Sequence, residues 1–316
     1  MSMLDKFGIS SSTVADQFHG CVLGRTLIMD ADDAAYAASA TAKKLDTAQR
    51  RFVTEVLQAM FLTGAEFARV HLTPKGCYKN GRHLLLGEKP YQGNRKGKMK
   101  PPLLEQVRDT AHTLFGDHPN VDVFQHYDIE ADDACVMDAY TVENPVLWSK
   151  DKDLCLAPCT RYCTETGRFL VLPKGDRFGY ITERYTESGK MKVTGHGTKF
   201  FWVQMLMGDT ADNIRGVKSY KGKLCGETTA LGLLRDIPTE DATANFVLDA
   251  YRAIDQNPLP EAEALWLLRV PGDSGSGYIW SLNLSEANRA FVLDCFNRKW
   301  KLTDEEWQHE LQGKSE

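Results

Sequence analysis

The stretch VLGRTLIMD (residues 22–30) decides the fold, because it is a short apolar run that ends in an aspartate. Such a run is typical of a buried strand. Working outward, ARVHLT (68–73) and VDVFQH (121–126) predict two more strands, and PVLWSKD (145–151) predicts a fourth that ends on Asp151. Several strands therefore deliver acidic residues at or near their carboxyl ends.

Helices are predicted between these strands. AAYAASATAKKL (34–45) has helical composition, apolar residues recur at helical spacing over residues 47–66, and DIEADDACVMDAYTV (128–142) begins with acids as many helices do. Strands that alternate with helices predict an α/β fold with a mixed, largely parallel central sheet flanked by helices. The functional site of such a sheet is expected at the carboxyl ends of its strands.

The later part of the chain has a different pattern. RFLVL (168–172), FGYIT (178–182) and MKVTG (191–195) predict antiparallel hairpins, and the chain becomes helical from Lys199. GDSGSG (272–277) is interpreted as a flexible loop, since it does not follow a strand as a dinucleotide-binding motif would. We expect a tail over residues 1–20, an α/β domain over 21–200 and a helical region over 201–316.

The composition of the chain is that of a globular protein without a membrane-spanning segment. The 316 residues are 42% hydrophobic and 26% charged, which is ordinary for a globular protein. No apolar run approaches the roughly 20 residues of a membrane span, and residues 1–20 do not read as a secretory leader, so we expect a cytoplasmic protein and no membrane partner. For a phage-encoded chain this would be the host cytoplasm.

Charge is segregated along the chain although the net charge is −5. Between residues 69 and 100 there are nine Lys or Arg and one acid, and between 215 and 235 there are five Lys or Arg and one acid. This distribution favours phosphate binding on basic flanks. Cys155, Cys159 and Cys163 have a spacing that suggests zinc, but a matching second pair is missing, and reduced thiols are the preferred interpretation.

Four clusters of carboxylates carry the chemistry. They are Asp30; Glu130, Asp132 and Asp133; Asp151 and Asp153; and Asp209 and Asp212. Carboxylate oxygens suit Mg²⁺ or Mn²⁺, and two such ions about 4 Å apart are a common arrangement for cutting phosphodiesters. We therefore interpret the chain as a nuclease that uses two divalent cations, and assign no nucleophilic side chain.

Simpler explanations exist for some of these acids. Asp32 and Asp33 are interpreted as a helix cap rather than as metal ligands. Glu130, Asp132 and Asp133 also suit the positive end of a helix dipole. Asp151 and Asp153 would share one face if their strand continued, so that both could reach one ion.

Five motifs in order resemble the structure-specific 5′ nuclease family, which includes flap endonucleases and bacteriophage 5′–3′ exonucleases. They are Asp30, YQGNRK (91–96), IEADD (129–133), SKDKDL (149–154) and GDTADNIRGV (208–217). The resemblance covers residues 22–235 and implies a PIN-like fold with a basic helical arch near 80–110 and a helix–three-turn–helix DNA-binding module. It also implies 5′–3′ exonuclease or flap endonuclease activity on DNA or RNA-primer 5′ ends, in phage DNA replication or recombination.

The resemblance also implies roles for individual residues. The first ion would be held by Asp30, Glu130, Asp132 and Asp133, and the second by Asp151, Asp153, Asp209 and Asp212. Arg95 and Lys96 would stabilise charge on the phosphate, and the module would bind K⁺. Nucleic acid, including RNA–DNA hybrid, would be contacted by Lys89, Tyr91, Arg95, Lys96, Lys98, Lys100, Lys218, Lys221 and Lys223. Replication proteins are conceivable partners.

Two residues depart from the family pattern. Gln92 stands where the family has Lys, and Pro74 stands where an Asp commonly follows the second strand. These departures leave open a DNA-binding protein on the same scaffold without catalysis. A PIN-like ribonuclease is a further alternative, and a DxDx[TV] phosphatase is disfavoured because Leu154 follows Asp153.

Overall fold

The computed structural model describes residues 20–164, 166–171, 175–186 and 188–313. The chain forms two compact units, Met1–Cys77 with Met99–Pro173 and Tyr78–Lys98 with Lys174–Glu316, and each is described here by itself. The basic segment 78–98 thus belongs to the same compact unit as the C-terminal part of the chain. The division into a catalytic domain and a helical region near residue 200 stays a prediction. Within the described ranges, no helix is both long and apolar enough to cross a bilayer.

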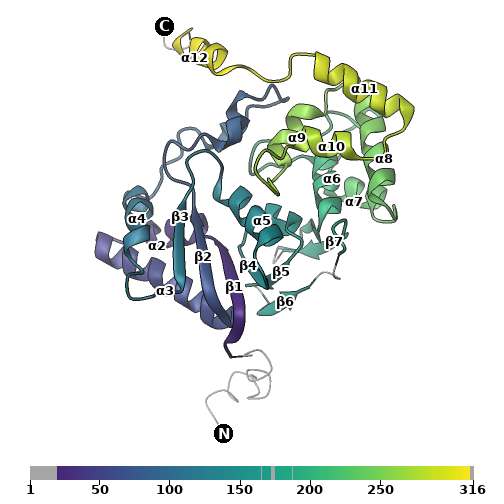
Figure 1. Cartoon of the computed structure of the whole chain (residues 1–316). Helices are drawn as coiled ribbons and strands as arrows, with labels where there is room; N and C mark the ends of the chain where they lie inside the picture. Colours follow the sequence, from purple (N-terminus) through teal and green to yellow (C-terminus); the bar gives the residue numbers. More distant parts are fainter. Residues whose placement is uncertain (1–19, 165, 172–174, 187, 314–316) are drawn as a thin grey trace. The chain divides into compact units, whose positions relative to one another are not determined.

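The first unit is built on a six-stranded sheet in the order β3-β2-β1-β4-β5-β6 (Figure 1). The strands are β1 (Val22–Asp30), β2 (Ala65–Leu72), β3 (Val121–Gln125), β4 (Pro145–Trp148), β5 (Thr160–Cys163) and β6 (Arg168–Leu170). All neighbours run parallel except β6, which is antiparallel to β5. The predicted α/β class with a largely parallel central sheet and flanking helices is confirmed.

Helices cover both faces of this sheet (Figure 1). The helices α2 (Asp32–Ala40), α3 (Leu45–Thr63) and α4 (Leu104–Thr110) bury their apolar sides against one face, where Phe52 and Val56 meet Leu27 and Met29. The helix α5 (Ala131–Thr141) packs on β1, β2 and β4 from the other face. The chain therefore changes face between β1 and β4, and such a switch point opens a crevice at the carboxyl ends of the strands.

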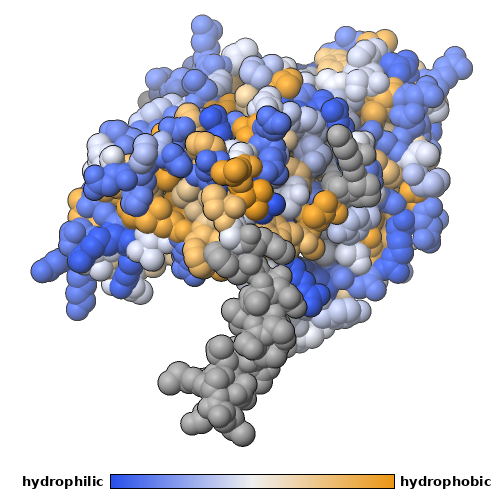
Figure 2. Space-filling view, turned by 60° about the horizontal axis from the view of Figure 1, so that its bottom comes forward, coloured by the Kyte–Doolittle hydropathy of each residue, from blue (hydrophilic) through white to orange (hydrophobic). Residues whose placement is uncertain are grey.

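The opposite, amino-terminal edge of the sheet is apolar at its surface. Figure 2 turns this end forward and shows apolar side chains exposed there. Leu23 at the start of β1, Phe61 near the end of α3 and Phe67 early in β2 are exposed. Gly64 makes the turn from α3 to β2 with φ of 64°, and a Cβ there would lie 2.3 Å from the Gly20 carbonyl oxygen. Asp30, the last residue of β1, lies at the other edge.

The second unit combines a hairpin with a group of helices. Its elements are β7 (Tyr180–Tyr185), β8 (Met191–His196), α6 (Thr198–Met207), α7 (Glu227–Leu234), α8 (Glu240–Arg252), α9 (Leu259–Leu265), α10 (Gly275–Ser281), α11 (Glu286–Asn297) and α12 (Asp304–Gly313). The helix α6 is buried on nearly all sides, which makes it the centre of the core. Trp202, Met205 and Leu206 are fully buried, as expected for core positions.

The prediction of a flexible loop over residues 272–277 is wrong. The helix α10 begins there, and the Ser274 side chain caps it by accepting a hydrogen bond from the Gly277 amide. Glu263 accepts further bonds from the Gly275 and Ser276 amides at 3.3 and 2.9 Å. These bonds satisfy the free amides of the first turn, so the glycines mark a helix start rather than a mobile segment.

Candidate functional site

Asp30 is the last residue of β1 and lies at the carboxyl edge of the sheet, beside His71 of β2 in the strand register. Burial raises the pKa of Asp30 well above its usual value, and the charges of Asp32, Asp151 and Asp33 raise it further. A hydrogen bond from the Asp32 amide opposes these effects only in part. The ionised carboxylate is therefore repelled by several neighbours, which is the situation that a bound cation relieves.

Asp151 and Asp153 lie in the loop after β4. The prediction that the strand runs to Asp151 is wrong, because β4 ends at Trp148, which pairs with Met29 of β1. Ser149 Oγ lies 3.4 Å from Asp30 Oδ2 and accepts a hydrogen bond from the Asp151 amide at 2.9 Å. A single serine thus connects the end of β1 with this loop.

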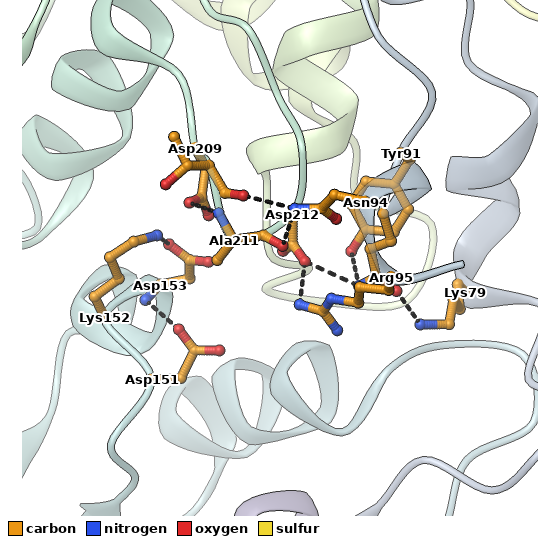
Figure 3. A network of polar contacts seen from close by, with 12 residues as sticks. Lys79, Tyr91, Asn94, Arg95, Asp151, Lys152, Asp153, Asp209, Ala211 and Asp212 are labelled. Atoms are coloured by element: carbon orange, nitrogen blue, oxygen red, sulfur yellow. Dashed lines mark hydrogen bonds and ion pairs between the residues drawn. The ribbon is translucent and has the colours of Figure 1, made fainter. Parts of the chain in front are cut away.

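The two acids of that loop are linked to one another in a turn and not by a shared strand face. The Asp153 amide donates to Asp151 Oδ1 at 2.9 Å, and Lys152 Nζ pairs with Asp153 Oδ1 at 2.8 Å (Figure 3). Asp153 then begins the short 3-10 helix Asp153–Leu156 and is largely buried. The loop therefore presents both carboxylates in a fixed arrangement. This arrangement comes from a turn and a 3-10 helix, not from the continued strand that the sequence suggested.

The start of α5 supplies the next cluster. Glu130 is the N-cap, and Asp133 completes a capping box by accepting a hydrogen bond from the Glu130 amide at 3.2 Å. Asp133 is fully buried, so at least one of its oxygens has a structural task. The Cys135 thiol lies beneath these groups, and burial, together with the charges of Asp30 and Asp132, raises its pKa well above the usual value. Asp30 and Asp132 thus act on one buried thiol.

Asp32 does not cap α2, and that interpretation is wrong. The N-cap is Ala31, without a side-chain cap. Asp32 Oδ1 instead accepts the Thr73 amide at 3.1 Å and pairs with Arg108 at 2.9 Å. Thr73 Oγ1 in turn accepts a hydrogen bond from the Ala131 amide at 2.9 Å. Thr73 and Arg108 thus brace the acidic edge formed by Asp30, Asp32 and the start of α5, and no sequence pattern pointed to Arg108.

A second polar network in the first unit was not expected from the sequence. His71 Nε2 donates to Asp138 Oδ2 at 2.9 Å, and its Nδ1 lies 2.9 Å from His126 Nε2. Arg69 also binds Asp138, at 2.5 Å. Burial acts to raise the pKa of Asp138, but hydrogen bonds from His71 and Arg69 outweigh it and lower the pKa. The network fixes α5 to β2.

In the second unit, Asp209 and Asp212 lie in the loop after α6. Asp209 is buried, its Oδ1 accepts the Ala211 amide at 2.9 Å, and its backbone pairs with that of Ile214. Asp212 Oδ1 binds Arg95 at 2.5 Å and Gln92 Nε2 at 3.0 Å (Figure 3). The loop and the basic motif, for which the sequence predicts different roles, are therefore joined by hydrogen bonds.

The other basic candidates are mostly exposed. Lys96, Lys98 and Lys100 lie on the surface, Lys100 in the first unit at 3.7 Å from Glu105. Lys218 pairs with Glu88 at 3.1 Å, whereas Lys221 lies over the Tyr220 ring. Lys223 exchanges backbone hydrogen bonds with Tyr220 in the same turn. Lys89 and Tyr91 line a small pocket beside Arg215 and the buried Glu261.

The three cysteines at four-residue spacing are reduced thiols in the first unit. Cys155 and Cys159 are buried and Cys163 is half-buried. Cys155 Sγ accepts a hydrogen bond from Arg161 at 2.6 Å. Burial raises the pKa of Cys159 to about 12. A thiol held in its protonated form is a poor metal ligand, so Cys159 serves packing.

A comparison with solved structures found proteins of similar fold. No family model matches the chain, and neither does any curated protein. Three similar solved structures are a T5 protein co-crystallised with metal ions (15% identity, TM-score 0.49), T5 5′-exonuclease with bound zinc (16%, 0.47) and the bacteriophage T5 flap endonuclease in a pseudo-enzyme–product complex with DNA and metal ions (17%, 0.46). Each match covers 86% of this chain and 98% of the other.

The class of protein is defined by the fold together with the acidic edge: an α/β protein with several carboxylates at the switch point of a largely parallel sheet. At 15–17% identity the matched structures transfer no function. The function has to come from the chain's own residues.

Proposed function

We propose that this protein is a metal-dependent nuclease that cleaves phosphodiester bonds at the 5′ ends or flaps of DNA. One observation carries the proposal: Asp30 at the end of β1 and Asp151 in the loop after β4 come close enough for the charge of Asp151 to raise the pKa of Asp30, and Ser149 hydrogen-bonds with both. A protein that gathers repelling carboxylates at a binding crevice loses stability for it, and divalent cations restore the balance.

The donor set fits Mg²⁺ or Mn²⁺. The acids of the edge offer hard carboxylate oxygens, and burial keeps the nearby Cys135 thiol protonated by raising its pKa. We propose that Asp30, Glu130, Asp132 and Asp133 hold one ion, and that Asp151, Asp153, Asp209 and Asp212 hold a second. When bound, such ions lower the pKa of a water molecule and neutralise charge on the phosphate.

The chain's own residues would bind and orient the nucleic acid. Arg95 and Lys96 stabilise the negative charge that develops on the phosphate, and Lys89, Lys98 and Lys100 contact the backbone. Tyr91 offers a ring for stacking. The turn with Lys218, Lys221 and Lys223 adds phosphate contacts, and K⁺ binds next to it. RNA primers, replication proteins and a phage source belong to the same proposal.

Cleavage is tested with 5′-labelled flap, nicked and single-stranded substrates in Mg²⁺, in Mn²⁺ and in EDTA. We expect short 5′ products with metal and none with EDTA. Asp122→Asn is a matched control, since Asp122 is exposed on β3 away from the edge. Binding without any cleavage would mean a DNA-binding protein without catalysis, and cleavage of RNA alone would favour the ribonuclease.

A further inference from the structure

The chain that follows α11 returns to the basic segment and pairs with it. The Leu86 amide donates a hydrogen bond to the Trp300 carbonyl at 2.9 Å. The Leu302 amide donates in turn to the Leu84 carbonyl at 2.9 Å, so that the two stretches form a short antiparallel pair. Such a pair fixes the register of both stretches. We call residues 299–307 the C-terminal strap, and Figure 1 shows the chain running there from α11 into the first turn of α12.

Side chains of the strap add to this pair. The Tyr78 hydroxyl donates to Asp304 Oδ1 at 2.9 Å. The His83 ring contacts two aromatic rings, with its centroid 5.2 Å from that of Tyr78 and 5.5 Å from that of Trp307, edge to face in both cases. Burial lowers the pKa of His83, and the charge of Asp304 opposes this only in part, so the ring packs in its neutral form. The strap is therefore attached to the basic segment by backbone and by side chains.

The strap is held in shape where α12 begins. Thr303 precedes the helix, its Oγ1 accepts the Glu306 amide at 3.2 Å, and Glu306 Oε2 accepts the Thr303 amide at 2.9 Å. This is a capping box, which satisfies amides that the start of a helix leaves free. Lys299 also pairs with Glu306. The strap residues whose side chains contact the basic segment, Asp304 and Trp307, thus lie on one ordered helical turn.

The strap contributes little to the core of the second unit. Each of its residues is exposed or half-buried, so it removes little apolar surface from water. Its partner lacks a regular structure of its own, because the 3-10 helix Lys79–Leu84 is kinked at Asn80 and Gly81, which have φ values of 53° and 68°. The conformation of such a short, irregular turn depends on the contacts around it. The strap supplies these contacts, and what it fixes is the position of its partner.

The stretch held by the strap leads directly to the proposed contacts with nucleic acid. Lys89 and Tyr91 come three and five residues after Leu86. The chain between them is anchored from another side, because the Glu88 amide donates to the buried Glu261 carboxyl group at 3.2 Å. The two anchors fix the direction from which Lys89 and Tyr91 leave the backbone. Without the strap these side chains would vary in position before DNA binds, and ordering them on binding costs affinity.

We propose that the C-terminal strap positions the basic segment for binding of the nucleic-acid backbone. Trp307 and Asp304 are positioning residues, which act through His83 and Tyr78 and do not touch the nucleic acid. The inference rests on the proposed function, because its ligand is a nucleic acid with a 5′ end. It does not require cleavage, so the two can fail separately.

The test measures binding of a 5′-tailed duplex in EDTA, where cleavage is suppressed, at several salt concentrations. Trp307→Ala should weaken binding about 5-fold, through the loss of an aromatic contact and of the order that it secures. The slope of log K against log[salt] should fall by about 0.7 to 0.9 for each phosphate contact that is lost. Trp307→Phe keeps a ring against His83 and should restore both quantities.

Asp304→Ala and Glu305→Ala form a matched pair. Both remove one negative charge from the first turn of α12, but Asp304 accepts the Tyr78 hydroxyl, whereas Glu305 is exposed beside it. We expect Asp304→Ala to bind DNA about 3-fold more weakly than Glu305→Ala. Tyr78→Phe should weaken binding by a similar factor, and Tyr78→Phe with Asp304→Ala should be no weaker than either alone.

Hydrogen exchange shows whether a variant has released the strap. The Leu86 amide, which donates to the Trp300 carbonyl, should exchange about 10-fold faster in Trp307→Ala than in Glu305→Ala. Thermal midpoints within about 2 °C of the wild type show that the rest of the fold is intact. A strap with a purely structural role would change the exchange rate without changing the salt slope.

Two outcomes overturn the inference. The first is faster exchange at Leu86 in Trp307→Ala together with the DNA affinity and salt slope of Glu305→Ala. The second is unchanged exchange at Leu86 in both Trp307→Ala and Asp304→Ala, because these side chains would then not hold the strap. If Trp307→Ala unfolds, the comparison of Asp304→Ala with Glu305→Ala decides in the same way. In each case a wild type that cleaves DNA leaves the proposed function standing, and a wild type that binds no nucleic acid contradicts both.

Discussion

The charge of Asp151, in the loop after β4, raises the pKa of Asp30, at the end of β1, and Ser149 hydrogen-bonds with both residues. Strands β1 and β4, at whose carboxyl edge these acids lie, are neighbours in the sheet but far apart in the chain. Their mutual repulsion is a cost to the folded protein without a cation. Several consequences can be measured.

Asp30→Asn should make the metal-free protein more stable and less active. The folded pKa of Asp30 is raised, so its contribution to stability is present below about pH 4 and is lost as the pH rises through the folded value. At pH 7.5 in EDTA we expect the variant to melt about 1–3 °C higher than the wild type. Mg²⁺ should stabilise the wild type more than the variant. A variant that melts lower in EDTA would contradict the proposed repulsion.

Asp153→Asn should abolish cleavage and leave DNA binding within a few-fold. The substitution keeps the size of the side chain and removes a charge that a cation needs. We expect the single-turnover rate to fall about 100-fold or more. The control is Asp122→Asn, which should cleave like the wild type. Full activity of Asp153→Asn would remove this residue from the metal site.

Arg95→Ala and Lys96→Ala should both slow cleavage at saturating DNA. Arg95 binds Asp212 and is held in place, so we expect a loss of about 10²-fold for it and a smaller loss for the exposed Lys96. Single-turnover rates under saturating enzyme give the comparison directly. Unchanged rates in both variants would place charge stabilisation elsewhere in the molecule.

The histidine network predicts a dependence of stability on pH. Burial and the nearby charge of His71 lower the pKa of His126 to about 4, from 6.5 in the unfolded chain, and Arg69 adds to this while Asp138 and Asp133 oppose it. The folded state therefore binds fewer protons than the unfolded chain between these values, so stability is lost as the pH falls from 6.5 towards 4. Thermal midpoints of His126→Gln should fall less steeply over this window; equal slopes would contradict the assignment.

Substitution of two glycines of the second unit by alanine should change the free energy of unfolding in opposite directions. At Gly275 a Cβ would lie 2.4 Å from the Ala262 carbonyl oxygen, whereas at Gly232 in α7 nothing lies within 4 Å. We expect Gly275→Ala to lower the free energy of unfolding by about 1–3 kcal/mol and Gly232→Ala to raise it by about 0.5–1 kcal/mol. Urea titrations of both variants give the comparison, and equal effects would be inconsistent with the packing of α9 against α10.

Local patterns predicted the elements well where the signal lies within a few residues. VLGRTLIMD forms β1 with the predicted bounds Val22–Asp30, and the acids of IEADD begin α5. The end of β4 was not predictable, because it is set by pairing with β1, and neither was the start of α10, because it depends on Glu263 in α9. Strand ends and helix starts of this kind are decided by tertiary contacts.

The sequence allowed the acidic residues of the site to be predicted, but not the residues that hydrogen-bond to them and hold them in place. Aspartates after predicted strands pointed to the carboxyl edge of the sheet, and Asp30 and Asp151 are brought together there. The partners that orient the acids come from distant positions: Arg108 for Asp32 and Gln92 for Asp212. A glutamine that departs from a family pattern gives no sign in the sequence that it holds a lysine thirteen positions earlier.

The most direct measurement is anomalous diffraction from crystals of the protein soaked in Mn²⁺. We expect anomalous peaks at the carboxyl edge of the parallel sheet, with Asp30 and Asp151 among the coordinating residues and oxygen atoms as ligands. Peaks elsewhere, or none at a concentration that supports cleavage in solution, would contradict the assignment of this edge as the metal site.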